Sequence, residues 1–110
     1  MTRPPVLFVH GYAGGPGAFD AWRHVLANRG HDPARLIDVH YESLVHDVTL
    51  KDVGEAFAHA IAADPRLGTD EPFDAIVHST GMLVVRAWLA LDPPRHRRRL
   101  RHLVALAPAT

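Results

Sequence analysis

The chain has 110 residues, and its 12 Lys and Arg balance 12 Asp and Glu, so its formal net charge is zero. A neutral chain is not held to a polyanion by its overall field, and the lack of cysteine excludes disulfides, thiolate zinc sites and a cysteine nucleophile. With 47% hydrophobic residues and no apolar run long enough for a membrane span or signal peptide, we expect a globular, cytoplasmic protein.

The first half of the chain predicts two strands with a helix between them. Residues 6–9 are a continuous apolar run, which is typical of a strand buried on both faces. After a glycine-rich loop, Phe19, Trp22 and Leu26 follow a helical spacing, and Gly30 comes after the predicted end. A second short strand is predicted over residues 36–39.

The next segment predicts a capped helix followed by a strand. Thr49 and Asp52 have the spacing of a capping box, in which each side chain bonds the other residue's backbone N–H. A helical stripe of apolar residues follows and ends before Asp64-Pro65, since proline cannot continue a helix. Residues 75–77 are then a third predicted strand.

The last segment completes the alternation of strands and helices. Residues 80–91 are apolar on almost every side, which predicts a buried helix that ends at Asp92-Pro93-Pro94, and residues 103–107 predict a fourth strand. The order βαβαβαβ predicts an α/β fold with an open, mostly parallel sheet and helices on both faces. Without a linker or internal repeat, we expect residues 1–110 to form a single unit.

The turn between the third strand and the buried helix carries a candidate nucleophile. Ser79 lies between the last strand residue and the first helical turn, where a tight turn exposes its hydroxyl above the sheet. The helix N-terminus favours negative charge that develops there, and Gly81 permits a close approach of the backbone. The alternative is that Ser79 serves only as a helix N-cap.

A second loop, His10-Gly11-Tyr12, follows the first strand at the same edge of the predicted sheet. Acyl transfer needs two N–H donors aimed at the developing oxyanion, and the amides of Tyr12 and Thr80 are suitable candidates. The alternatives are an ordinary connector or a phosphate-binding loop. The second of these fails because neither G-x-G-x-x-G nor a Lys-Ser/Thr pair accompanies the glycines.

Taken together, residues 5–11 with Gly14-Gly15, and residues 75–81 with 84–89, resemble the α/β-hydrolase superfamily, esterase/lipase branch. The strand at 103–108 matches the strand that follows the elbow helix in that family. The resemblance implies the sheet order second, first, third, fourth, and a small-molecule ester substrate or acyl ligand without cofactor or metal. It also implies site roles: Ser79 as nucleophile, Tyr12 and Thr80 as oxyanion hole, and His10, Gly11 and Gly81 as the supporting loop.

The same resemblance predicts an acid and a base after the serine, and the chain offers only Asp92, His96 and His102 there. The helix 80–91 runs away from Ser79 at about 1.5 Å per residue, so we expect all three at the opposite edge of the sheet. An evident catalytic Asp and His are therefore missing.

We expect a partial hydrolase domain, truncated after its fourth strand and inactive by itself; the alternative is a non-catalytic relic or binding module. A small nucleotide-binding domain is disfavoured by the missing phosphate loop.

Two further patterns have simpler explanations. The arginine-rich residues 95–101 lack the aromatic platform of a nucleic-acid site, so we expect a solvated connector and no nucleic-acid partner. None of the 9 histidines is four residues from another, which disfavours a metal site. The last strand should have an exposed edge, and we expect possible self-association through it.

Overall fold

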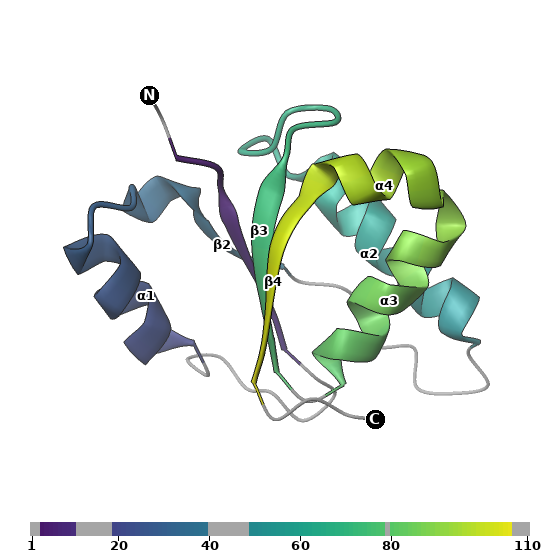
Figure 1. Cartoon of the computed structure of the whole chain (residues 1–110), viewed down its shortest axis with the longest axis horizontal. Coiled ribbons are helices and arrows are strands. Elements are labelled where there is room, and N and C mark those ends of the chain that lie inside the picture. Colours follow the sequence, from purple (N-terminus) through teal and green to yellow (C-terminus); the bar gives the residue numbers. More distant parts are fainter. Residues whose placement is uncertain (1–2, 11–18, 40–48, 79, 107–110) are drawn as a thin grey trace.

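A computed structural model describes residues 3–10, 19–39, 49–78 and 80–106. The strands of this part form one parallel sheet in the order β2-β1-β3-β4 (Figure 1). This α/β architecture confirms the predicted fold class, and the strand order is the one that the family resemblance implied. The strands are β1 (Val6–Val9), β2 (Leu36–Asp38), β3 (Phe73–His78) and β4 (Leu100–Leu106).

Helices cover the two faces of the sheet unequally. Figure 1 shows α1 on one side of the strands, with α2, α3 and α4 on the other. No residue of α1 is buried, so this helix covers its face only loosely. The helices of the described part are α1 (Asp20–Asn28), α2 (Leu50–Ala63), α3 (Gly81–Leu91) and α4 (Pro93–Arg99), and a 3₁₀ turn, η1 (Pro33–Arg35), precedes β2.

The fully buried strand β1 separates two apolar cores. Because successive side chains of a strand point to opposite faces, Leu7 and Val9 join the larger core with α2 and α3, and Val6 and Phe8 join the smaller one beside α1. Trp88 of α3 is 1% exposed and lies at the centre of the larger core. The continuous apolar run predicted from the sequence is therefore explained by burial on both sides.

Helix α2 begins at the predicted capping box. The Asp52 N–H donates to Thr49 Oγ1 at 3.1 Å, and the Thr49 N–H donates to Asp52 Oδ2 at 3.0 Å. These hydrogen bonds, chiefly the one from the Thr49 backbone, stabilise the carboxylate and hold the pKa of Asp52 below its ordinary value. Two of the amides that a helix N-terminus leaves unpaired are thereby satisfied.

The segment after α3 differs from its prediction. Residues 93–99 form helix α4, whereas the sequence led us to expect a solvated connector over 95–101. Proline is tolerated in the first turn of a helix, where its missing N–H has no partner to lose, so Pro93-Pro94 ends α3 and also begins α4. One side of α4 is packed: His96 is 9% exposed and its ring stacks on Trp88 with centroids 4.0 Å apart.

Strands β3 and β4 are longer than the sequence predicted. β3 begins at Phe73 rather than Ala75, and β4 begins at Leu100 rather than Leu103. Main-chain pairing explains the extension, because Phe73 is in register with Leu100, and Asp74 with His102. A polar residue can join a strand when its neighbour supplies the backbone hydrogen bonds, and apolar periodicity does not record that pairing.

Candidate functional site

The candidate site is built where β1 ends and α3 begins. A Cβ atom added to Gly81 would overlap the carbonyl oxygen of Val9 and would lie 3.1 Å from its carbonyl carbon. The first turn of α3 therefore touches the backbone at the end of β1, and only a residue without a side chain fits there. Figure 1 shows the start of α3 at the end of the sheet where β1 and β3 finish.

Thr80 and His10 lie on either side of this contact. Thr80 has helical backbone angles, and its carbonyl accepts hydrogen bonds from the N–H groups of Leu83 at 2.9 Å and Val84 at 3.3 Å. His10 follows Val9 and is half-buried. Since Val9 is in register with Val77, His10 and His78 come next on two adjacent strands. The ends of β1 and β3 thus meet the N-terminus of α3 at one edge of the sheet.

The predicted nucleophile and part of its supporting loop lie outside the described residues. This is so for Ser79, Gly11 and Tyr12, while His10, Thr80 and Gly81 lie within them. The structure brings the last three together at the carboxyl edge of the sheet. The roles of Ser79 as nucleophile and of the Tyr12 and Thr80 amides as donors remain predictions.

Of the three residues weighed as catalytic acid or base, the two histidines make other contacts and Asp92 is exposed. Asp92 follows the last residue of α3 and is exposed. The Nδ1 atom of His96 lies 2.7 Å from the carbonyl oxygen of Trp88, so this histidine joins α4 to α3. On β4, His102 Nδ1 lies 3.0 Å from Asp74 Oδ1 on the neighbouring strand.

The His102–Asp74 pair lies near the opposite edge of the sheet from the candidate site. Asp74 precedes His78 by four residues on β3, which corresponds to about 13 Å along an extended strand. His102 is in register with Asp74 and is therefore displaced equally from the carboxyl edge. Neither side chain is within hydrogen-bonding reach of a group at the start of α3 in this arrangement.

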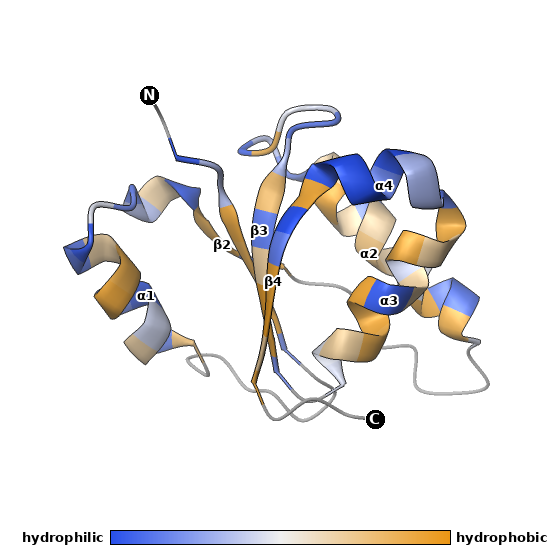
Figure 2. Cartoon of the chain, in the orientation of Figure 1, coloured by the Kyte–Doolittle hydropathy of each residue, from blue (hydrophilic) through white to orange (hydrophobic). Residues whose placement is uncertain are grey.

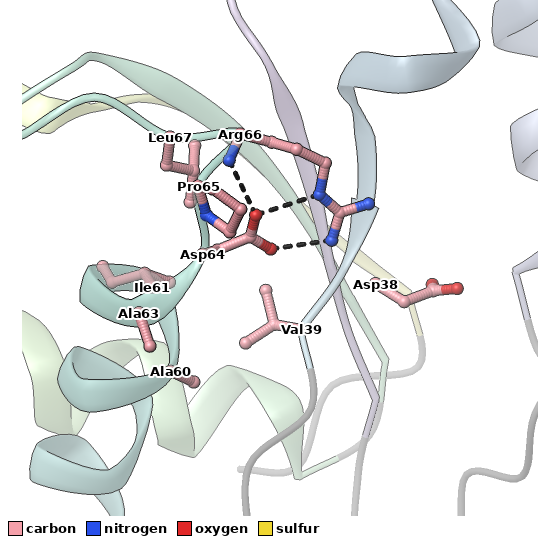
Figure 3. Close-up of a pocket in the computed structure, with 9 residues that line it drawn as sticks. All are labelled: Asp38, Val39, Ala60, Ile61, Ala63, Asp64, Pro65, Arg66 and Leu67. Atoms are coloured by element: carbon pink, nitrogen blue, oxygen red, sulfur yellow. Dashed lines mark hydrogen bonds and ion pairs between the residues drawn. The ribbon is translucent and has the colours of Figure 1, made fainter.

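A cavity of about 370 Å³ lies between the end of β2 and the last turns of α2 (Figure 3). Its polar lining consists of Asp38, Asp64 and Arg66, and Asp64 accepts hydrogen bonds from the Arg66 guanidinium at 2.9 and 2.7 Å. These hydrogen bonds are the main reason why the pKa of the Asp64 carboxyl lies below its ordinary value. Figure 3 shows the carboxylate of Asp64 turned toward Arg66, with Asp38 pointing away. The described residues that line it include no serine or histidine.

The described part of the chain holds neither a cluster of metal ligands nor a helix that could span a membrane. Among residues 3–10, 19–39, 49–78 and 80–106, no three or more His, Asp or Glu side chains gather as metal ligands do. No helix in that part of the chain has both the length and the apolar character needed to cross a membrane.

The chain resembles a solved hydrolase structure. It matches the phospholipase PlaB from Legionella pneumophila with a TM-score of 0.77 and 28% sequence identity, over 98% of this chain. The fold is lipase-like. The match covers 25% of that chain, so the present chain spans a quarter of the protein that it resembles. No protein-family model matches the sequence, and no curated protein matches it.

Proposed function

We propose that this chain is the nucleophile-bearing part of a serine hydrolase that acts on carboxylic esters. The observation that carries the proposal is the contact of Gly81 with the Val9 carbonyl, which joins the start of α3 to the end of β1. In an open parallel sheet, ligands bind outside the carboxyl ends of the strands. The lipase-like fold and the resemblance to a phospholipase support an ester as the substrate class.

In the proposed reaction, the Ser79 hydroxyl attacks the ester carbonyl carbon, and the carbonyl oxygen becomes an oxyanion. The amides of Tyr12 and Thr80 would donate hydrogen bonds to that oxygen, and the N-terminal end of α3 would stabilise its negative charge. A general base must take the serine proton and return it to the departing alcohol. The oxyanion then collapses, the ester C–O bond breaks, and an acyl-serine remains for hydrolysis.

We infer that the general base is not His96 or His102. His96 is buried against Trp88, and His102 bonds Asp74 near the opposite edge of the sheet. A catalytic base must lie within hydrogen-bonding reach of the hydroxyl that it deprotonates. We therefore propose that the acid and base come from a segment outside these four strands, and that residues 1–110 form one partial domain.

The same placement of the two histidines favours a second candidate function, a non-catalytic α/β-hydrolase relic that binds an acyl ligand. Loss of the serine or histidine of a triad costs on the order of 10⁶ in kcat in subtilisin, which is the reference case for this effect. By that measure, the 110-residue chain should hydrolyse short p-nitrophenyl esters negligibly, and any residual rate should survive Ser79→Ala. Turnover above about 1 s⁻¹ that Ser79→Ala abolishes would overturn this expectation.

A fluorophosphonate probe tests the hydrolase proposal more directly, since it reports whether the serine is activated rather than whether turnover is complete. The chain should be assayed alone and joined to any coding sequence found to follow it, with Ser79→Ala as the negative control. Labelling of the longer protein that Ser79→Ala abolishes would support the hydrolase. If both forms remain unlabelled while an acyl ligand still binds, the binding module is the better description.

A further inference from the structure

The zero net charge of this chain conceals a strong separation of charge. Residues 92–102 contain five arginines and one aspartate, a formal charge of +4, so the rest of the neutral chain carries −4. Figure 2 shows α4 as a largely hydrophilic segment beside the mostly apolar α3. In Figure 1, α4 lies at the end of the sheet where the strands begin, away from the start of α3. The arginines are therefore remote from the proposed ester site.

Three of these arginines line one depression. Arg95, Arg98 and Arg99 have the spacing that places side chains on the same face of a helix. Together with Asp70 they surround a hollow of about 220 Å³. A water molecule occupies about 30 Å³ in the liquid, so this volume is large enough for several waters or for a small polar ion.

The depression holds three guanidinium groups and one carboxylate. Asp70 has a left-handed backbone conformation with φ of 62°, and its Oδ1 accepts a hydrogen bond of 2.6 Å from Arg95 Nε. Arg95 is the main partner of this carboxylate, and the charges of Arg98 and Arg99 also stabilise it. With three guanidinium groups and one carboxylate, the lining carries a net formal charge of +2.

The other two arginines differ in how they are held. Arg99 is half-buried, and its Nε donates to the neutral carbonyl oxygen of Glu71 at 3.2 Å, with its guanidinium 5.5 Å from the centre of the Phe73 ring. Burial lowers the pKa of Arg99, while the Asp70 carboxylate acts against that shift, Arg95 adds to it and Glu71 opposes it. Arg98 is exposed and donates no hydrogen bond to any residue in the described part of the chain.

We propose that Arg95, Arg98 and Arg99 form a binding site for a phosphate group. A phosphate monoester carries a charge of about −1.5 to −2 at neutral pH, which matches the net charge of +2 in the lining. Planar guanidinium groups bind phosphate oxygens through paired N–H donors, and Arg98 has its whole set of donors available. The site is separate from the ester site and does not depend on the function proposed above.

Arg97 provides a matched control for the test. It lies next to Arg98 in the same helix and carries the same charge, but it does not line the depression. Inorganic phosphate is titrated into the 110-residue chain at constant ionic strength, and binding is followed by calorimetry for the wild type, Arg98→Gln and Arg97→Gln. We expect saturable binding that Arg98→Gln weakens about tenfold and Arg97→Gln less than twofold.

A second arm distinguishes free phosphate from a lipid headgroup. Co-sedimentation is measured with phosphatidylcholine vesicles that contain or lack phosphatidic acid, for the same three proteins. Binding in either arm that depends on Arg98 but not on Arg97 supports the site and identifies its source of phosphate. Equal losses in both variants would show only a diffuse positive field, and the proposal would be wrong. The absence of saturable binding in both arms would also overturn the proposal. Circular dichroism verifies that each variant is folded.

Discussion

At the scale of single residues, the candidate site depends most directly on Gly81, because only a hydrogen atom in place of a side chain fits against the Val9 carbonyl. Substituting alanine would drive a Cβ into the Val9 carbonyl, and neither backbone group can move without disturbing β1 or α3. We expect Gly81→Ala to lower the free energy of unfolding by about 2–3 kcal/mol, the upper range for overpacking a core. Urea denaturation followed by circular dichroism measures this loss.

Gly68 offers the control for that prediction. A Cβ at Gly68 would lie 3.5 Å from the Glu71 Cβ, an ordinary van der Waals distance. Gly68→Ala should therefore change the stability by less than about 0.5 kcal/mol, as a surface substitution does. If the two variants were equally stable, α3 and β1 would not be in close contact at Gly81. The proposed site would then lose its main structural support.

The ion pair of Asp64 and Arg66 predicts a dependence of stability on pH. Hydrogen bonds from Arg66 hold the folded-state pKa of Asp64 below its ordinary value of 3.8. A lowered carboxyl pKa contributes stability above the unfolded-state value, and that contribution is lost as the pH falls through the folded-state pKa. We expect Asp64→Asn to cost about 0.5–1 kcal/mol at neutral pH, since the Arg66 side chain is 49% exposed.

Denaturation of the wild type and of Asp64→Asn at neutral pH and at about pH 2.5 measures this contribution as a difference, which removes the effect of the other carboxylates. The deficit of the variant should shrink in acid. A deficit of the same size at both pH values would show that the charge of Asp64 does not contribute and that only its hydrogen bond to the Arg66 backbone matters.

At the scale of helices, the contact between α2 and α3 also depends on a glycine. A Cβ at Gly54 would lie 2.8 Å from the Ala87 carbonyl carbon and 2.9 Å from the Trp88 nitrogen. Alanine in place of glycine gains about 1 kcal/mol of helix propensity, but here the clash with the backbone of α3 outweighs the gain. We expect Gly54→Ala to destabilise the chain by about 2 kcal/mol, measured by thermal and urea unfolding.

The reverse substitution on the exposed side of the same helix separates propensity from packing. Ala62 is exposed, so Ala62→Gly should cost only the propensity difference of about 1 kcal/mol. A stabilised Gly54→Ala protein would mean that α2 and α3 do not approach each other as closely as described. It would not affect the contact of Gly81 with β1, which involves a different pair of elements.

At the scale of the whole molecule, the cover on the α1 side of the sheet is incomplete. Val104 of β4 is 43% exposed, and β4 is the outermost strand of the described sheet. An exposed apolar strand with an open edge favours pairing with another chain. We expect the purified chain to form dimers or larger species at micromolar concentration, which analytical ultracentrifugation measures.

Two lysine substitutions test whether β4 is the surface responsible. Val104→Lys places a charge on the exposed strand and should shift the chain toward monomer. Leu50→Lys removes an apolar side chain of α2 that is more exposed, at 61%, and should leave association unchanged. A wild-type chain that remains monomeric at every concentration would contradict the prediction. The non-catalytic alternative would then be favoured over a partial hydrolase.

The sequence by itself determined the features that depend on neighbouring residues. The capping box of Thr49 and Asp52, the buried run of residues 6–9 and the order of strands and helices are local patterns, because side-chain spacing and burial repeat with the period of each element. The predicted turn at residue 79 is marked in the same way, since Ser79 follows an apolar strand and Gly81 comes two residues later.

Only the tertiary structure decided which distant residues meet. It placed Gly81 against Val9 and Gly54 against Ala87, stacked His96 on Trp88, and brought Asp70 to Arg95. It also showed that the arginine-rich segment forms α4. The apolar spacing of this helix is weak, so its stability comes from the face that packs against α3. Contacts between residues far apart in the chain depend on how the elements pack, and the spacing of residues within an element carries no record of that packing.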